Sequence, residues 1–388
     1  MGWVLAIIFL VVLVFLGFDY FDVIKTWIDR IKIGRVTDNS EWESLVKSVI
    51  FNWLVNSTPE LPKDENKKFK LIDKIKKNEE VSSTSYWQDA AVVKALTNIH
   101  TGYTDEDLAG FIEDYIDAET GEWKPDDVRV DSAMLCYELL CNDKIDKEAV
   151  KPAMDYVAGF LKESAGEEKL IPYSEFAPDM LFVDTIGLVC PFLIKYAIVY
   201  DSPEYIEIAI NQIKQYHVFG FDKETRLPFH CYNKDSFAKL GVSGWGRGCA
   251  WWAVGLVDSL FTLLDEKKHN PEKAMLLKYI IMFLEEMLKY QCSDGSFGRF
   301  VQIDSQQDSS AAAMLAYCYA KMWTLTEKDN YREAAEKVIE HLKYCTRRNG
   351  VIDYSQGDTK GIGFYSDSAT VVPAAQGFAV AAVEILSK

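Results

Sequence analysis

The sequence predicts an all-α protein, an (α/α) six-fold barrel of six helical hairpins that follows an N-terminal transmembrane helix. Three observations lead to this prediction. An apolar run opens the chain. Twelve later segments repeat apolar residues at three- and four-residue spacing, which is the period of amphipathic helices. Alternate segments differ sharply in charge. The chain of 388 residues is long enough to bury such a core in one domain.

The first element is the apolar run from Gly2 to Phe18, whose length is at the lower limit for crossing a bilayer. No small-residue cleavage site follows it, which favours a signal anchor over a removed signal peptide. Four basic residues follow the run: Lys25, Arg30, Lys32 and Arg35. By the positive-inside rule, these residues favour a single-pass anchor with the rest of the chain in the cytoplasm.

Three regions follow from this pattern. We expect a membrane anchor in residues 1–22, a juxtamembrane linker in 23–40 and one barrel domain in 41–388. Within the barrel domain, the lysine- and glutamate-rich segment from Pro59 to Ser83 is predicted to be a loop or long connection.

Twelve helices are predicted in the barrel domain. Their ranges are 41–56, 86–100, 106–117, 129–141, 147–163, 183–200, 203–217, 247–264, 271–291, 308–324, 330–345 and 367–386. Polar turns separate several of them, for example Asp294 to Gly298 and Arg347 to Gly350.

The charge of the predicted helices alternates along the chain. Four have almost no charged residue: 183–200, 247–264, 308–324 and 367–386. Those between them carry a charged stripe: 203–217, 271–291 and 330–345. A helix that is apolar all round is buried, whereas a helix with one apolar stripe covers a core. Alternating buried and covering helices form a closed ring of hairpins, with the starts of the inner helices at one end.

Composition limits the partners of the protein. With 42 basic and 59 acidic residues, its net charge of −17 argues against nucleic acid, whose binding depends on neutralising phosphates. The eight cysteines show no paired metal spacing and are predicted to be buried free thiols in a reducing compartment. No phosphate loop, dinucleotide fingerprint or zinc cluster is visible, so we expect neither a cofactor nor a metal.

The starts of the inner helices should meet in one cleft, where helix dipoles favour anions. Candidate site residues at these starts, and in the loop before residue 245, are Trp87, Gln88, Asp89, Asp131, Asp184, His230, Tyr232, Asn233, Trp245, Arg247, 306–310 and 365–368. Arg247 lies in the stretch SGWGRGCAWW. A guanidinium stays charged and needs an anionic or carbonyl partner, so Arg247 either fastens the fold or holds a ligand. The neighbouring glycines are expected to let the backbone turn tightly.

Five motifs occur in order at these positions: FVDTIGLVCPFLIKYA, PFHCYN, GWGRGCAWWAVGLVDSL, QDSSAAAMLAY and VPAAQGFAVAA. Together they resemble glycoside hydrolase families 88 and 105, the unsaturated glucuronyl and rhamnogalacturonyl hydrolases. The resemblance covers the chain from about Tyr86 to the C-terminus. It implies removal of an unsaturated uronic acid from oligosaccharides that a polysaccharide lyase has produced. The expected partner is therefore such an oligosaccharide.

The resemblance also implies a mechanism. An aspartic acid protonates the ring double bond between carbons four and five, water adds at carbon five, and the resulting hemiketal opens and expels the rest of the saccharide. This requires one protonated carboxyl group, a second polar group to orient it, and donors for the substrate carboxylate.

Asp184 lies where these families place their general acid and base, and Asp131 matches their second carboxylate. Asp126 and Asp127 compete with Asp131 for that role. Both Asp184 and Asp131 have an alternative interpretation as helix N-caps, because aspartate is a preferred residue there. His230 matches the family histidine, which hydrogen bonds the sugar or the acid.

Five residues are predicted to bind substrate: Trp245, Arg247, Trp87, Gln88 and Tyr232. By the resemblance, Trp245 stacks on the sugar and Arg247 binds its carboxylate or hydroxyls. The alternative for Arg247 is a structural role in which it satisfies loop carbonyls.

The sequence departs from the family pattern in three places. Cys249 and Ala250 replace Asn-Gly, Asn233 replaces an aspartate, and Thr185 with Ile186 replaces a glycine and an aromatic residue. Two other functions therefore stay open. One is a different barrel chemistry on a surface or capsular polymer, such as an epimerase, a lyase or a conventional glycosidase. The other is a membrane-tethered saccharide-binding protein without activity.

Overall fold

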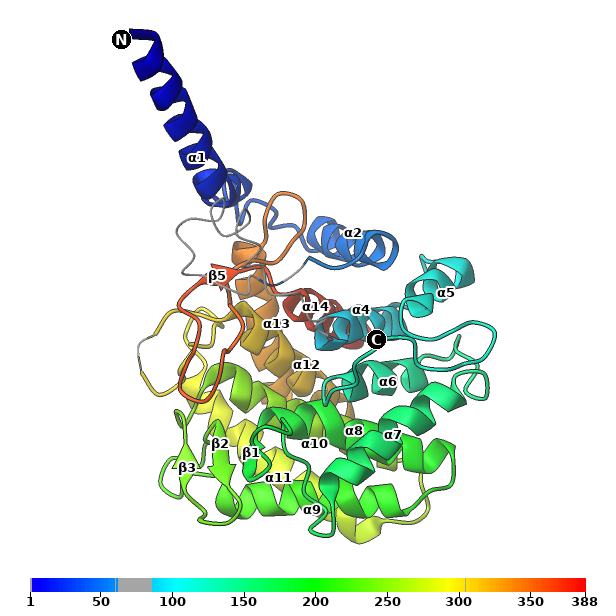
Figure 1. Ribbon diagram of the computed structural model, residues 1–388. Coiled ribbons are helices and arrows are strands. Elements are labelled where there is room, and N and C mark those ends of the chain that lie inside the picture. Colours follow the sequence, from blue (N-terminus) through cyan, green and yellow to red (C-terminus); the bar gives the residue numbers. More distant parts are fainter. Residues whose placement is uncertain (1, 60, 62–85, 304) are drawn as a thin grey trace.

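The computed structural model describes residues 2–59, 61, 86–303 and 305–388. In this part of the chain, twelve helices form a barrel and one long helix, α1, projects from it (Figure 1). The predicted (α/α) six-fold barrel is confirmed. Most of the segment predicted as a connection, Pro59 to Ser83, lies outside the described residues.

Six helices form the inner ring. They are α4 (Tyr86–Ile99), α6 (Ser132–Cys141), α8 (Asp184–Val199), α10 (Gly246–Leu263), α12 (Ser309–Thr326) and α14 (Pro373–Leu386). Each packs beside the next in this order, and α14 packs on α4 to close the ring. Most residues of α10, α12 and α14 are buried, as their low content of charged residues predicted.

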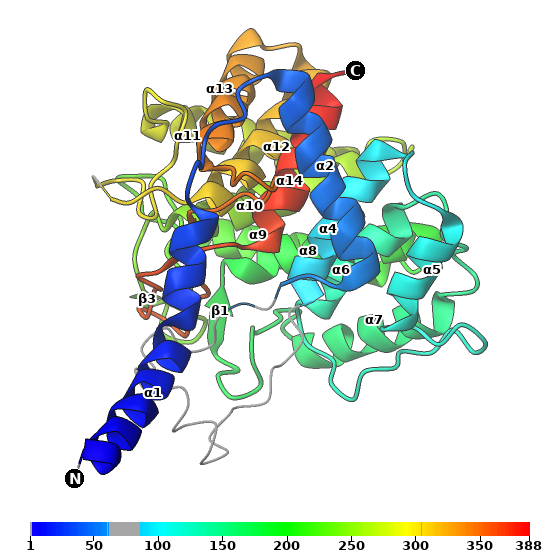
Figure 2. The ribbon, with the colours of Figure 1, turned by 90° about the horizontal axis from the view of Figure 1, so that it is seen from above.

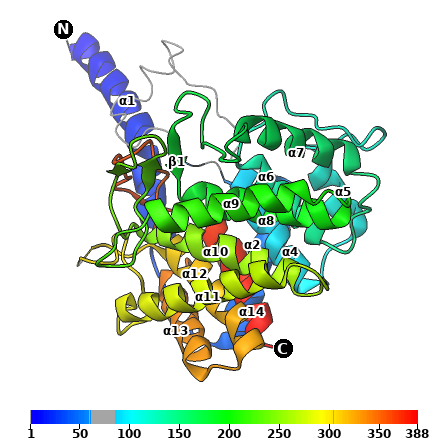
Figure 3. The ribbon, with the colours of Figure 1, turned by 90° about the horizontal axis from the view of Figure 1, so that it is seen from below.

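Six outer helices cover this ring. They are α2 (Asn39–Asn56), α5 (Asp105–Glu113), α7 (Lys151–Ala165), α9 (Glu204–Phe219), α11 (Asn270–Met287) and α13 (Asp329–Cys345). For example, α9 packs on α8, α11 on α10 and α13 on α12. Figure 3 shows α9, α11 and α13 side by side on the outside of the barrel. They bury one face and expose charged residues on the other.

Glycines let the inner helices approach closely. A Cβ atom on Gly377 of α14 would lie 2.0 Å from the carbonyl oxygen of Ala91 on α4, and one on Gly255 of α10 would lie 2.3 Å from that of Ile186 on α8. Any side chain at these positions would push neighbouring backbones apart, so the ring requires glycine there.

A buried charge network fills the centre of the ring. Lys94 of α4 lies 2.8 Å from the Glu138 carboxylate of α6 and 3.0 Å from the Asp258 carboxylate of α10, and the hydroxyl of Tyr317 donates to Asp258. Burial lowers the pKa of Lys94, but Asp258 and Glu138 raise it further, so its pKa lies well above the ordinary value. The ammonium group therefore stays charged and paired in the interior.

Short strands that the sequence analysis did not predict join the helices. Strands β1 (Met180–Phe182), β2 (Cys231–Asn233) and β3 (Lys239–Leu240) form an antiparallel sheet in that order, and β4 (Ser355–Gln356) pairs with β5 (Ala369–Thr370). The last helix was predicted from residue 367 but begins at Pro373, because β5 occupies part of that range. Proline is well suited to the first turn of a helix.

Helix α1 (Gly2–Asp29) projects from the barrel (Figures 1 and 2). Its stretch Gly2–Phe21 has 20 residues and is long and apolar enough to cross a membrane. Such a helix near an N-terminus fits a membrane anchor or a signal sequence. The helix continues past residue 22, the predicted end of the anchor, and the chain after it returns to the barrel, where the Gly34 N–H donates to the carbonyl of Thr346.

Candidate active site

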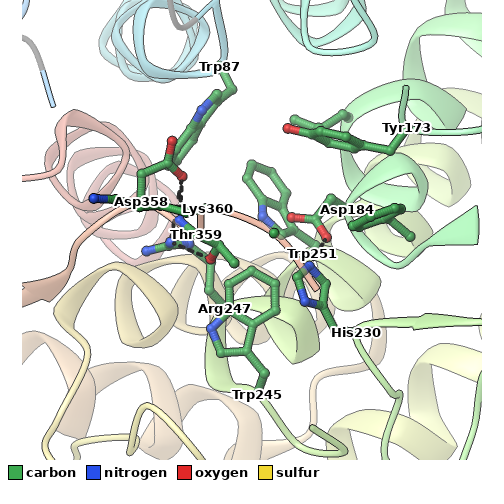
Figure 4. Close-up of a pocket in the computed structure, with 13 residues that line it drawn as sticks. Trp87, Tyr173, Asp184, His230, Trp245, Arg247, Trp251, Asp358, Thr359 and Lys360 are labelled. Carbon is green, nitrogen blue, oxygen red and sulfur yellow. Dashed lines mark hydrogen bonds and ion pairs between the residues drawn. The ribbon is translucent and has the colours of Figure 1, made fainter. Parts of the chain in front are cut away.

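A pocket of about 260 Å³ lies at the end of the barrel where the inner helices begin (Figure 4). The aromatic side chains that line it are Trp87, Tyr173, Phe182, Trp245 and Trp251. Its charged or ionisable residues are Asp184, His230, Arg247, Asp358 and Lys360. The pocket thus combines flat apolar walls with acids, bases and cations, which suits a charged sugar.

Pairing of β1 with β2 brings Asp184 and His230 together although they are 46 positions apart. The strands align Phe182 with Cys231, and the Val183 N–H donates to the carbonyl of His230 at 2.9 Å. Asp184 follows as the first residue of α8, and its Oδ2 atom lies 3.5 Å from Nε2 of His230. Figure 4 shows both side chains directed into the pocket.

Asp184 does not act as the cap of its helix. The N-cap position of α8 belongs to Val183. Oδ2 of Asp184 is buried and has no hydrogen-bond partner among the residues that the structure describes. A buried carboxylate oxygen without a partner is costly, and such atoms are typical of sites that await a ligand.

His230 is held by aromatic rings rather than by hydrogen bonds. Its ring lies 4.7 Å from that of Trp245, 5.2 Å from that of Phe182 and 5.4 Å from that of Tyr365, measured between centroids. In the described part of the chain, its Nδ1 atom has no hydrogen-bond partner. The imidazole is therefore fixed in place with Nε2 directed toward Asp184 and Nδ1 still available.

Asp131 is buried beside the pocket and is not among the residues that line it. It occupies the N-cap position of α6, but its side chain makes no capping hydrogen bond to that helix in the described structure. Burial raises the pKa of its carboxyl group to about 6, although Arg129 and the backbone N–H of Trp87 lower it. The charges of Asp131 and Asp184 both act on the Tyr173 hydroxyl and help to raise its pKa, which burial raises most.

Trp245 forms one wall of the pocket, and its indole N–H donates to the Gln356 side chain at 2.9 Å. The glycines around it work differently from the prediction. The tight turn is at Gly244, with φ of +76°, whereas Gly246 and Gly248 are helical. A Cβ on Gly246 would lie 2.5 Å from the Gly298 carbonyl oxygen, so this glycine serves close packing.

Arg247 is buried and donates to two backbone carbonyls, those of Gln356 at 2.7 Å and Gly357 at 2.9 Å. Its guanidinium also lies 5.3 Å from the Trp245 ring centroid and 4.0 Å from Oδ1 of Asp358. It thus fastens the loop that carries Asp358 to the pocket, as the alternative interpretation expected. Because Arg247 also lines the pocket, it contributes positive charge there.

The sequence matches the family model described as Glycosyl Hydrolase Family 88 over residues 59–384. The chain belongs to glycoside hydrolase family 88. No curated protein matches the sequence.

Solved structures of similar fold include members of families 88 and 105, unsaturated glucuronyl hydrolases and a protein named as a polysaccharide lyase. A possible family 105 member from Klebsiella pneumoniae has a TM-score of 0.74 at 19% identity, with 91% of this chain and 94% of that chain covered. One from Salmonella enterica has a TM-score of 0.73 at 18% identity, with 90% and 94% covered. An unsaturated glucuronyl hydrolase from Bacillus sp. GL1, responsible for glycosaminoglycan degradation, has a TM-score of 0.64 at 16% identity, with 88% and 96% covered. At these identities the likeness shows the shared fold.

Two predicted substrate-binding residues of this family 88 protein lie outside the set that lines the pocket. The side-chain oxygen of Gln88 accepts from the Ala374 N–H at 3.0 Å and so joins α4 to α14. Tyr232 is buried against Tyr216 and Phe219. Trp87, predicted with them, does line the pocket.

The positions that depart from the family pattern also lie outside the residues that line the pocket. Cys249 and Ala250 are buried in α10, and Asn233 organises the turn after β2 by accepting from the N–H groups of Asp235 and Ser236. Thr185 donates to the Phe182 carbonyl at 2.6 Å. These substitutions therefore affect the packing around the site.

The sequence analysis missed Tyr173 and the loop residues Asp358 to Gly361, all of which line the pocket. Both sets lie in loops without apolar periodicity. The glycine-rich stretch QGDTKGIGFY, placed between two predicted helices, was the signal that marked the second loop.

Within residues 2–59, 61, 86–303 and 305–388, no group of three or more histidine, cysteine, aspartate or glutamate side chains is arranged to hold a metal ion. All eight cysteines belong to these ranges and are free thiols, but the prediction that they are buried is wrong for Cys292, which is exposed, and Cys141 is only half-buried.

Proposed function

We propose that this glycoside hydrolase removes an unsaturated uronic acid from lyase-derived oligosaccharides by hydrating the ring double bond. One observation carries the proposal. Asp184 presents an unpartnered carboxylate oxygen 3.5 Å from His230 inside an aromatic pocket. This arrangement offers a proton donor and a neighbouring acceptor to a bound ring. The names of solved neighbours, which include an unsaturated glucuronyl hydrolase specific for heparin, support the same class of substrate.

In the proposed reaction, Asp184 in its acid form transfers a proton to carbon four of the double bond. Water adds at carbon five and loses a proton to the Asp184–His230 pair, which restores the acid. The hemiketal formed at carbon five then opens, and the saccharide at carbon one leaves with its oxygen. The net change is the addition of one water molecule, so no oxidant or cofactor is needed.

Cations and aromatic walls position the sugar in this proposal. Lys360 is exposed and lines the pocket, so its ammonium group is placed to meet the substrate carboxylate. Arg247 adds positive charge to the pocket, but its guanidinium donates hydrogen bonds to the loop carbonyls of Gln356 and Gly357. Trp87 and Trp245 offer flat faces for stacking on the pyranose ring.

Asp131 is proposed to act as the second carboxylate. With a pKa of about 6, its carboxyl group is partly protonated near neutral pH. Because Asp131 does not line the pocket, it acts indirectly, through the effect of its charge on the Tyr173 hydroxyl, which does line it.

We also propose that α1 anchors the enzyme in a membrane with the barrel on the cytoplasmic side. The 20-residue apolar stretch, the basic residues that follow it and the eight free thiols support this orientation.

The test is the loss of the ultraviolet absorbance of the double bond that is conjugated with the carboxylate. The full chain in detergent micelles is incubated with a set of unsaturated uronyl disaccharides, beside Asp184→Asn and the matched control Asp235→Asn, whose side chain is exposed in the β2–β3 turn. We expect the wild type and the control to consume the double bond and Asp184→Asn to lose at least about a hundredfold in rate, the usual contribution of general acid–base catalysis.

Other outcomes identify the alternatives. Release of reducing sugar while the double bond persists would indicate a conventional glycosidase, which uses two carboxylates at the scissile bond. Saturable binding of the disaccharides without any turnover by folded protein would indicate a binding protein.

A further inference from the structure

Helix α1 leaves the barrel on the face that carries the pocket. Figure 2 shows α1 extending on the side of β1 and β3, while α14 runs the other way toward the C-terminus. Figure 3 shows the same relation from below, with α1 and the loop before β1 projecting in one direction. Because the inner helices begin at this end, the mouth of the pocket and α1 point to the same side.

A cluster of four charged residues fixes this direction. The guanidinium of Arg30 makes two hydrogen bonds of 2.8 Å to the carboxylate of Asp353 and one of 2.7 Å to the carbonyl of Ala369. Arg347 joins the same carboxylate at 2.7 Å and Asp29, the last residue of α1, at 3.0 Å. Burial raises the pKa of Asp353, but its hydrogen bond with Arg30 and the charge of Arg347 lower it further, so its pKa lies below the usual range.

This cluster, Asp29, Arg30, Arg347 and Asp353, is a geometrically specific connection because both arginines bind the carboxylate through directed donors. It replaces a free linker between anchor and barrel. Asp353 lies two residues before β4, and Ala369 is the first residue of β5. The cluster therefore binds both ends of the loop that carries Asp358 and Lys360 into the pocket.

The spacing places the pocket mouth near the membrane. Asp29 lies eight positions after Phe21, the end of the apolar stretch. At a rise of 1.5 Å per residue, this helical segment spans about 12 Å. The loop that leads from α7 into β1 projects along α1 over this region (Figures 2 and 3).

Large apolar side chains are exposed on the loops of this face. Phe176 is 90% exposed on the loop before β1, Phe364 is 74% exposed on the loop between β4 and β5, and Ile303 is 64% exposed between α11 and α12. Each of the three loops leads toward the start of an inner helix, α8, α12 or α14, at the end of the barrel that carries the pocket. Exposed apolar side chains grouped in this way mark an interaction surface.

We propose that this face is a membrane-docking surface: Phe176, Ile303 and Phe364 enter the interface of the bilayer that α1 spans, and the pocket opens toward the lipid headgroups. The inference rests on the anchoring role of α1 and goes beyond the proposed reaction. Its partner is the lipid surface itself, because α1 brings a bilayer to this face. With a net charge of −17, the protein gains nothing from anionic lipids, so zwitterionic lipid suffices.

The test measures the lipid contact of single positions in the full chain, reconstituted in phosphatidylcholine vesicles. All labelling variants also carry Cys292→Ser, which removes the exposed native cysteine. An environment-sensitive thiol dye is then attached to Phe176→Cys, Phe364→Cys, the anchor control Leu10→Cys or the lateral control Tyr156→Cys on α7, where Tyr156 is 53% exposed. Background labelling is low because burial raises the pKa of the Cys141 thiol to about 11.

Brominated acyl chains quench a dye that touches them. We expect at least a twofold loss of fluorescence at positions 176, 364 and 10 and no loss at position 156. Quenching at position 10 without quenching at positions 176 and 364 would overturn the docking proposal, and so would an absence of quenching at position 10. A blue shift at 176 and 364 without quenching would also overturn it, since protein would then cover the face. The measurement requires no turnover, so it is independent of the proposed reaction.

Discussion

Replacing Asp131 by asparagine removes a carboxyl group that burial makes costly to ionise. The folded protein raises the pKa of this group from 3.8 to about 6, chiefly through burial. An acid whose pKa is higher in the folded state loses its proton first in the unfolded chain. Stability therefore falls as the pH rises from 3.8 to about 6 and stays lower above that range. Asp131→Asn lacks this penalty, so we expect it to stabilise the protein.

The size of the gain follows from the shift. About two pKa units at about 1.36 kcal/mol each correspond to about 3 kcal/mol in the free energy of unfolding at about pH 8, falling to about 0.5 kcal/mol at about pH 4. The new amide oxygen can still accept the Trp87 N–H. Arg129 loses the buried Asp131 carboxylate at 3.5 Å but keeps Asp127 at 3.4 Å, and because the Arg129 side chain is itself 32% exposed, solvent limits the cost of this loss.

The assay is urea unfolding of the full chain in detergent at pH 4, 6 and 8, with Asp235→Asn as the exposed matched control. The increase in the free energy of unfolding caused by Asp131→Asn should grow from pH 4 to pH 8. The difference between the control variant and the wild type should be the same at all three pH values. A gain that is the same at every pH, or a loss of stability at pH 8, would refute the reasoning, because burial would then not dominate the energetics of Asp131.

Two further predictions concern Arg247 and Cys292. Arg247→Met leaves the carbonyls of Gln356 and Gly357 without their donors, so the free energy of unfolding should fall by about 3 kcal/mol, at about 1.5 kcal/mol for each bond to a charged group. Unchanged thermal and urea unfolding, together with a raised KM, would instead make Arg247 a pure substrate ligand. Cys292 is exposed and free, so in intact cells a membrane-impermeant maleimide should leave it unlabelled until the cells are opened. Labelling of intact cells would place the barrel outside.

The order and type of the barrel helices were predictable because the spacing of apolar residues and the distribution of charge within each segment indicate how the helix packs. Segments with almost no charge, such as 247–264, became inner helices, and the segment 330–345 with its charged stripe became the outer helix α13. The predicted start of the last helix was wrong because a short strand, β5, occupies the residues predicted as its first turn. The strand β5 has two residues, which is too short for any alternation to be recognised in the sequence.

The candidate site was only partly predictable, for a physical reason. Asp184, His230, Trp245, Arg247 and Trp87 line the pocket as expected from their places at helix starts and in the adjoining loop. The partners of Arg247 are backbone carbonyls more than a hundred residues away. Every residue has a backbone carbonyl, so the sequence cannot indicate which ones bind Arg247. Gln88 and Tyr232 were predicted to bind substrate because of their places in the sequence, but their side chains contact other parts of the protein. Tertiary packing decides the direction of a side chain, and the sequence does not indicate it.

The charge network of Lys94, Glu138 and Asp258 has a consequence for how a polymer is degraded. Lys94 lies eight residues below the start of α4, about 12 Å at the helical rise, and its side chain crosses the ring to α6 and α10. The barrel is therefore a blind well rather than a tunnel. If the proposed reaction is correct, a saccharide must enter this well end first and leave by the same opening, so we expect removal of one terminal residue per encounter and no cleavage inside a chain.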